Sequence, residues 1–134
     1  MELRAPDYVV VVVDDLERGL RFYRDVLGLP LAHRSGPYAQ FATGTTRVSL
    51  YERGAMAETL GRALVAPDPA APAFELGFKV DDCDRAYQQL VGLGAEPAAV
   101  PTDRAWGQRT AYVRDPDGHL VELAQDLGPS GQTE

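Results

Sequence analysis

Apolar and polar residues follow two different periods along this chain, and the changes of period predict an order of elements. Residues 8–14, YVVVVVD, are short, β-branched and almost wholly apolar, which is typical of a buried strand. Residues 15–28 carry apolar side chains at helical spacing and end in a glycine, which predicts a helix. Three strands are predicted next, at about 30–34, 38–43 and 46–52, with SGP and TGT as turns between them.

The same order of elements returns after residue 73. Residues 75–81, ELGFKVD, are strand-like, and residues 82–94 are helix-like and again end in a glycine. Strands are then predicted near 96–101, 108–114 and 119–125. The sequence DPDG between the last two strands is a strong turn signal, because proline stands second and glycine fourth.

The two halves can be aligned on short motifs. VDD occurs at 13–15 and again at 80–82, an offset of 67 residues. VSL at 48–50 matches VEL at 121–123 at an offset of 73 residues. The chain is therefore predicted to contain two copies of a βαβββ module.

The repeat sets the boundaries of a single domain with two modules. Module one covers about residues 7–53 and module two about 74–126. The segment between them, 54–73, becomes rich in proline and alanine and is predicted to be a linker, with a short helix expected within 55–65. Residues 128–134 are predicted to form a flexible tail.

Composition and charge narrow the class of function. A chain of 134 residues with 45% hydrophobic and 25% charged residues has the profile of a folded domain. The formal net charge of −7 argues against a nucleic-acid partner, which would require clustered Lys and Arg, and it leaves room for cationic or neutral small molecules. The apolar run at the start is too short to span a bilayer and no signal segment is visible, so we expect a cytoplasmic protein without a membrane partner.

Cys83 is the one cysteine of the chain, which excludes an internal disulfide. A nucleophilic cysteine would need a base beside it, and the sequence shows none. The histidines His33 and His119 are interpreted as surface or strand-edge residues, because strand alternation places His119 on the face opposite Glu122.

A doubled βαβββ module that carries DLERGLRFYRDVLGLPL and DPDGHLVEL resembles the vicinal oxygen chelate superfamily, which includes glyoxalase I, extradiol dioxygenases, fosfomycin-resistance transferases and bleomycin-resistance proteins. The match covers about residues 7–126, and WGQR followed by DPDG is most similar to the drug-binding and glyoxalase-like branch. The resemblance implies an α+β fold in which two modules form a cupped mixed β-sheet around a site, with helices on the outside. It also implies a homodimer, because sheet edges and an apolar flank need cover.

The resemblance further implies four positions for metal ligands, at the start of the first strand and on the last strand of each module. These positions hold Tyr8 and Ser49 in module one and Glu75 and Glu122 in module two. Carboxylates suit an ion of the Mg, Mn or Fe type, but two protein ligands are fewer than the roughly three of a typical catalytic site. No cofactor is therefore favoured, and the alternative is a divalent metal held weakly by the two glutamates. A further interpretation treats both as solvated carboxylates at strand ends.

Several residues are candidates for lining a pocket for an organic ligand. Trp106 either stacks on a planar or cationic group or plugs its own loop. Arg109 either holds a ligand carboxylate or pairs with a surface acid. Tyr112 shares a strand face with Glu122 if the DPDG hairpin keeps a regular register. The full candidate set is Tyr8, Tyr38, Phe41, Tyr51, Glu75, Trp106, Arg109, Tyr112 and Glu122, with core packing as the alternative for Tyr38, Phe41 and Tyr51.

These observations favour a binding protein of the bleomycin-resistance type, which sequesters a small organic ligand of the antibiotic kind. The alternative is a metal-dependent, glyoxalase-like lyase, isomerase or dioxygenase that uses Glu75 and Glu122 as metal ligands. A third hypothesis is a family member without a ligand. Metal analysis separates the first two, and ligand screening separates the first from the third.

Overall fold

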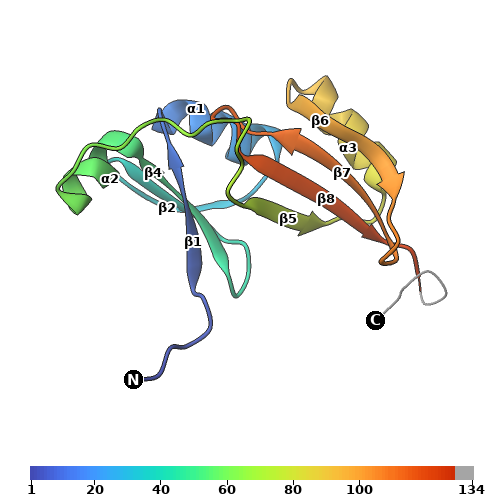
Figure 1. Ribbon diagram of the computed structural model, residues 1–134, viewed down its shortest axis with the longest axis horizontal. Coiled ribbons are helices and arrows are strands. Elements are labelled where there is room, and N and C mark those ends of the chain that lie inside the picture. The colour runs from blue at the N-terminus through green and yellow to red at the C-terminus, as the bar shows by residue number, and fades with distance from the viewer. Residues whose placement is uncertain (129–134) are drawn as a thin grey trace. The chain divides into compact units, whose positions relative to one another are not determined.

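The structure, a computed structural model, describes residues 1–128 and separates into two compact units that divide between Ala66 and Pro67 (Figure 1). Within these residues each unit holds one βαβββ module and one four-stranded mixed sheet. The α+β fold class and its modular pattern are thereby confirmed. The sheet that the two modules would form together stays a prediction. The predicted tail lies outside the described residues beyond Gly128.

Module one has seven elements within the described residues. They are β1 (Tyr8–Val13), α1 (Leu16–Leu20), η1 (Arg21–Val26), β2 (Leu31–Ser35), β3 (Tyr38–Phe41), β4 (Arg47–Glu52) and α2 (Arg53–Leu60). The strand order in the sheet is β1-β4-β3-β2. Strand β1 runs parallel to β4, and the other neighbours are antiparallel. The short helix expected near the start of the linker is α2, which follows β4 directly.

The helix predicted over residues 15–28 divides into two parts. An α-helical turn, α1, continues into the π-helical segment η1, where the Leu27 N–H donates to the carbonyl of Phe22 five residues earlier, at 2.8 Å. Phe22 and its neighbour Tyr23 are both buried, and their rings meet edge to face with centroids 5.0 Å apart. The wider π turn thus accompanies the burial of two adjacent aromatic residues.

Module two repeats the pattern with five elements within the described residues. They are β5 (Glu75–Lys79), α3 (Cys83–Gly92), β6 (Glu96–Asp103), β7 (Gln108–Arg114) and β8 (Leu120–Asp126). The strand order β5-β8-β7-β6 is the same as in module one, with β5 parallel to β8. Val10 pairs with Ser49 in module one and Gly77 pairs with Glu122 in module two, which reproduces the sequence offsets of 67 and 73 residues.

Both helices of the repeat begin in the same way. The second aspartate of each VDD motif is the N-cap: Asp15 accepts from the Arg18 N–H and Asp82 from the Arg85 N–H, each at 3.1 Å. An N-cap carboxylate satisfies one of the donors that a helix start leaves unpaired. In module two the next residue, Cys83, donates its N–H to the Gln125 side chain on the last strand at 2.9 Å. The repeated motif therefore fixes the helix start to the sheet.

The core of module two lies between its sheet and α3, which contacts β6, β7 and β8 (Figure 1). Strand alternation sends Ala111, Val113, Val121 and Leu123 into this core, and all four are buried. The opposite face of the same strands carries Tyr112, Glu122 and other polar residues.

No helix within residues 1–128 is both long and apolar enough to cross a membrane.

The DPDG turn holds β7 and β8 in register. The Asp115 carboxylate accepts from the N–H groups of Asp117 and His119 at 2.9 and 2.8 Å. Gly118 adopts φ +88°, and a Cβ there would lie 2.8 Å from the ring of Pro69, so the position favours glycine for two reasons. From this turn the β7–β8 pairing continues without a bulge to the far ends of both strands.

Candidate functional site

The polar side chains of module two gather on the sheet face opposite α3, which we call the open face of module two. Side chains alternate along a strand, so Glu75 and Lys79 of β5 lie on this face with Glu122 of β8 and Tyr112 of β7. Glu122 stands between two partners, directly opposite Gly77 on one side and Tyr112 on the other. The regular hairpin register is what brings Tyr112 and Glu122 onto one face.

Tyr112 and Glu122 are joined by a hydrogen bond. The Tyr112 hydroxyl donates to Oε2 of Glu122 at 2.9 Å, and both side chains are half-buried. Burial raises the pKa of the Tyr112 phenol, and the hydrogen bond and negative charge of Glu122 raise it further. Tyr112 is therefore held as a neutral donor that fixes one oxygen of the carboxylate.

Glu75 converges on the same carboxylate from the start of β5. Partial burial raises the pKa of Glu75, and the charge of Glu122 together with a hydrogen bond between the two carboxyl groups raises it further. A carboxyl pair of this kind favours a state in which one proton, a cation or an external hydrogen-bond donor lies between the two groups. The pair is thus a position at which a ligand donor can be accepted.

The polar row continues past Tyr112 to residues that the sequence reasoning did not single out. Thr110, fully buried and two positions before Tyr112 on β7, accepts from Nε of Arg104 at 2.8 Å. The side chain of Thr110 lowers the pKa of the Tyr112 phenol, against the larger effects that raise it. Alternation along β7 could have identified Thr110, whereas Arg104 comes from a loop and had no periodic signal.

A second series of hydrogen bonds lies at the other end of the open face and orients Trp106. The Trp106 Nε1–H donates to Oε1 of Gln108 at 2.9 Å, and the Gln108 amide donates to Asp126 at 3.1 Å. Asp126 also pairs with Lys79 at 2.8 Å. Trp106 is 53% exposed, so its side chain is oriented by the N–H bond to Gln108 while much of the residue stays open to solvent.

Two residues predicted to bind the ligand, Arg109 and Phe41, lie on the opposite side of their sheets from the polar clusters. Arg109 lies on the α3 side of β7 and bonds Asp84 at 2.9 Å and Asp103 at 3.0 Å, which is the pairing with surface acids weighed as its alternative. Phe41 is fully buried in module one, with its ring 6.3 Å from that of Tyr23, which is the core-packing alternative. Their roles in ligand binding stay predictions.

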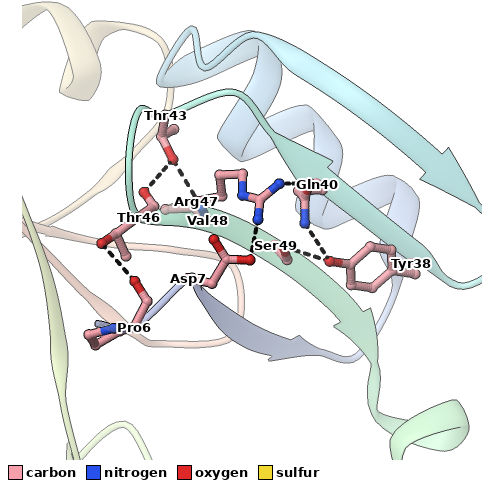
Figure 2. A network of polar contacts seen from close by, with 9 residues as sticks. All are labelled: Pro6, Asp7, Tyr38, Gln40, Thr43, Thr46, Arg47, Val48 and Ser49. Atoms are coloured by element: carbon pink, nitrogen blue, oxygen red, sulfur yellow. Dashed lines mark hydrogen bonds and ion pairs between the residues drawn. The ribbon is translucent and has the colours of Figure 1, made fainter. Parts of the chain in front are cut away.

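Module one carries a different network on the sheet face that bears Tyr38 and Ser49. Figure 2 shows this network, in which Ser49, at the position equivalent to Glu122, is fully buried and bonds the Tyr38 hydroxyl at 2.9 Å. Gln40 donates to the same hydroxyl at 2.9 Å and accepts from Arg47 at 3.3 Å, and Arg47 also pairs with Asp7. These polar groups bond one another, and the one carboxylate among them, Asp7, is paired with Arg47. The network therefore has no carboxyl pair like that of module two.

The remaining predicted tyrosines of module one lie around this network. The Tyr51 ring meets that of Tyr38 edge to face, with centroids 6.1 Å apart, and its hydroxyl lies 3.0 Å from that of Thr59 on α2. Tyr8, at the start of β1, is 53% exposed. Tyr38, Tyr51 and Tyr8 thus stay on one side of the sheet, while Phe41 lies in the core.

The residues of module two do not fit a tightly held metal ion. Within residues 1–128 the structure has no group of three His, Cys, Asp or Glu side chains placed to hold an ion. Glu75 and Glu122 supply two carboxyl groups, of which one oxygen is already engaged by Tyr112. His119 packs beside Phe74 instead, with the two rings tilted by 49° and their centroids 5.5 Å apart. Two carboxyl groups hold a hard ion weakly and mainly through water.

The one cysteine lies outside the site, and the cavities beside the site are small. Cys83 is the buried first residue of α3, its thiol lies 3.5 Å from the Leu123 carbonyl, and burial raises the pKa of the thiol, which disfavours the reactive thiolate. A cavity of about 200 Å³ lies between the 67–74 segment and the DPDG turn, flanked by Phe74 and His119. A second cavity, of about 270 Å³, is lined by Glu75 itself together with Phe74 and Leu120. Pockets for drug-sized ligands are about 300–1,000 Å³, so each cavity alone is small for one.

Comparisons with known proteins bear on this geometry. A family model described as the Glyoxalase/Bleomycin resistance protein/Dioxygenase superfamily matches residues 5–123. The uncharacterized protein YraH of Bacillus subtilis is 37% identical over 121 residues, which is 87% of this chain and 94% of that protein. The bleomycin resistance protein of Geobacillus stearothermophilus is 27% identical over 124 residues, covering 86% of this chain and 92% of that protein.

Solved structures with the same fold are also similar. A glyoxalase/bleomycin resistance protein/dioxygenase from Nocardioides has a TM-score of 0.81 and 26% identity, covering 100% of this chain and 92% of that one. A protein of unknown function from Agrobacterium tumefaciens has a TM-score of 0.79 and 29% identity, covering 95% and 98% of the two chains.

Proposed function

The chain belongs to the Glyoxalase/Bleomycin resistance protein/Dioxygenase superfamily, and on this premise we propose that it binds and sequesters a small organic molecule on the open face of module two. The observation that carries the proposal is the convergence of Glu75 and Glu122 beside the Tyr112 hydroxyl. A ligand that brings hydrogen-bond donors between the carboxyl groups relieves their repulsion and satisfies their free oxygens.

The surrounding groups define the kind of molecule that would bind. A cationic or donor-bearing group is accepted by Glu75 and Glu122, in keeping with the net charge of −7. A planar group stacks on the exposed face of Trp106, whose orientation is set by Gln108. Arg104 is held through Nε at Thr110, and its terminal amino groups are the donors that an acceptor on the ligand would use.

Similar proteins support a ligand of the antibiotic kind. The relative from Geobacillus stearothermophilus is a bleomycin resistance protein, and the alignment with it covers most of both proteins. Sequestration needs only affinity and no chemical step, which agrees with a site made of a carboxyl pair, a phenol and an indole. Bleomycin is therefore the first ligand to test.

The same carboxyl pair supports one second candidate, a metal-dependent lyase, isomerase or dioxygenase with Glu75 and Glu122 as ligands. Such an enzyme needs about three protein ligands to retain its ion, and module two offers two carboxyl groups within the described residues. Binding without chemistry is for this reason the favoured function.

Calorimetric titration of bleomycin into the metal-free protein tests the proposal. We expect the wild-type protein to bind and Glu122→Gln to lose at least tenfold in affinity, which is about 1.4 kcal/mol. The control, Glu58→Gln, removes the same charge from an exposed position on α2 and should bind like wild type. No binding by the wild-type protein, or equal affinity for Glu122→Gln, would contradict the proposal.

A further inference from the structure

Gly77 stands directly opposite Glu122 in the parallel pairing of β5 and β8. A Cβ atom built on Gly77 would lie 2.9 Å from Oε1 of Glu122, and real Cβ atoms essentially never approach another heavy atom so closely. The Glu122 carboxylate therefore occupies the space that any other residue at position 77 would fill with its own side chain.

The backbone of Gly77 does not itself require glycine. Gly77 lies within a regular strand and is not among the described glycines with positive φ. Glycine within a strand costs stability, because it lacks a side chain to pack and has more freedom to lose on folding. A strand glycine without a backbone reason often marks the close approach of another group, which here is the Glu122 carboxylate.

Module one shows the opposite combination at the equivalent pair. There Val10 stands opposite Ser49, so a branched side chain on the first strand is matched by a short one on the last. In module two the first strand has no side chain and the last strand has a long one. The larger side chain thus belongs to the first strand in module one and to the last strand in module two. Of the two pairs, only Gly77 and Glu122 leave room for a carboxylate across the first strand.

We infer that Gly77 is the positioning residue of the site: its missing side chain lets the Glu122 carboxylate lie across β5, within reach of both Tyr112 and Glu75. The effect of Gly77 on ligand affinity rests on the proposed function, but its effect on the position of Glu122 does not. Residue 77 therefore determines whether this sheet face presents a fixed carboxylate.

An alanine at position 77 is a selective perturbation. The atom that its Cβ would meet is the end of a flexible side chain, so the Glu122 carboxylate can rotate away without a movement of either strand. That rotation breaks the bond from Tyr112 and separates the two carboxyl groups. Alanine also restricts the unfolded chain more than glycine does, which favours folding.

The test uses protein labelled with ¹³C at the tyrosine ζ carbon, which reports on hydrogen bonding by each phenol. The Tyr112 resonance, one of six, is assigned by its loss in Tyr112→Phe. We expect Gly77→Ala to move this resonance to its position in Glu122→Ala, with a loss of thermal stability no larger than that of Tyr112→Phe, which lacks the same hydrogen bond. The control is Gly92→Ala on α3, where an added Cβ meets nothing within 4 Å, and it should leave the resonance unmoved.

A Tyr112 resonance that stays at its wild-type position in Gly77→Ala would overturn the inference. If Gly77→Ala does not fold, the double variant Gly77→Ala/Glu122→Ala removes the clash and should fold, and failure of the double variant would overturn the inference as well. Bleomycin affinity is measured in parallel and should fall at least tenfold in Gly77→Ala. If the wild-type protein binds no ligand, the proposed function fails while the resonance still decides the role of Gly77.

Discussion

Tyr112 donates its hydroxyl hydrogen to the Glu122 carboxylate at 2.9 Å, across directly paired positions of β7 and β8. This hydrogen bond joins the two strands of the DPDG hairpin on the face that α3 leaves open. It fixes one oxygen of Glu122 and leaves the other beside Gly77 and Glu75. The ligand binding proposed for module two depends on this arrangement.

Removal of the Tyr112 hydroxyl should lower the stability of the folded protein. In Tyr112→Phe the Glu122 carboxylate loses its donor in a half-buried position, and we expect the free energy of unfolding to fall by about 1–2 kcal/mol. Urea unfolding measures the change. The matched control is Tyr87→Phe on α3, since the Tyr87 hydroxyl makes no hydrogen bond within the described residues. Equal losses in the two variants would show that the Tyr112–Glu122 bond contributes nothing specific.

The raised pKa of Glu75 predicts a stability that depends on pH. Well below the ordinary value of 4.5, Glu75 is protonated in both the folded and the unfolded chain. As pH rises above 4.5 the unfolded chain releases this proton first, so the folded chain holds more protons and the free energy of unfolding falls. Glu75→Gln cannot ionise and should be the more stable protein at pH 7, with the advantage lost below pH 4.5.

The size of this effect is limited by solvent. Glu75 is exposed, so the gain in Glu75→Gln should stay below about 1 kcal/mol and shrink at high salt. Thermal unfolding of both proteins between pH 4 and pH 8 measures it, with Glu58→Gln as the control that should show no such trend. A wild-type protein more stable than Glu75→Gln at pH 7 would reverse the sign expected from the carboxyl pair.

Trp106 should report ligand binding through its fluorescence. It is the one tryptophan of the chain, is 53% exposed and is oriented by its bond to Gln108, so a stacked ligand removes its free face from water. We expect a blue shift or quenching that saturates with the same affinity as the calorimetric signal. A bound ligand that leaves the emission unchanged would place Trp106 outside the site.

We further propose that the chain forms a homodimer. Strands β2 and β6 are terminal in their four-stranded sheets, and uncovered edges of this kind are usually paired or covered. Light scattering on a size-exclusion column should give twice the chain mass of 14.5 kDa at micromolar concentration. A mass of one chain at that concentration would contradict the proposal.

The fold could be predicted from the sequence because two strong local signals agree. The repeated VDD motif marks both helix starts, where Asp15 and Asp82 are the N-caps, and the period of two marks the strands. The π-helical turn of η1 could not be predicted, because its apolar spacing is also that of an α-helix. The π turn accompanies the burial of two adjacent aromatic residues, Phe22 and Tyr23.

The candidate site could be predicted only in part. Alternation places Tyr112 and Glu122 on one face once the DPDG turn fixes the register, but sequence does not give the registry of β5 against β8. Gly77 opposite Glu122 therefore had no sequence signal. Arg104 was missed because loop residues follow no period, and its contact with Thr110 depends on the loop conformation.

Native mass spectrometry of the purified protein tests most directly whether module two is a site for an organic molecule or for a metal. The protein is purified without chelator, incubated with bleomycin and a fractionated metabolite extract, and compared with Glu122→Gln. We predict an organic adduct on the wild-type protein that is strongly reduced in Glu122→Gln, and well under one metal ion per chain. One tightly held Zn, Fe, Mn or Ni ion per chain, without an organic adduct that depends on Glu122, would contradict ligand sequestration and favour the metal-dependent enzyme.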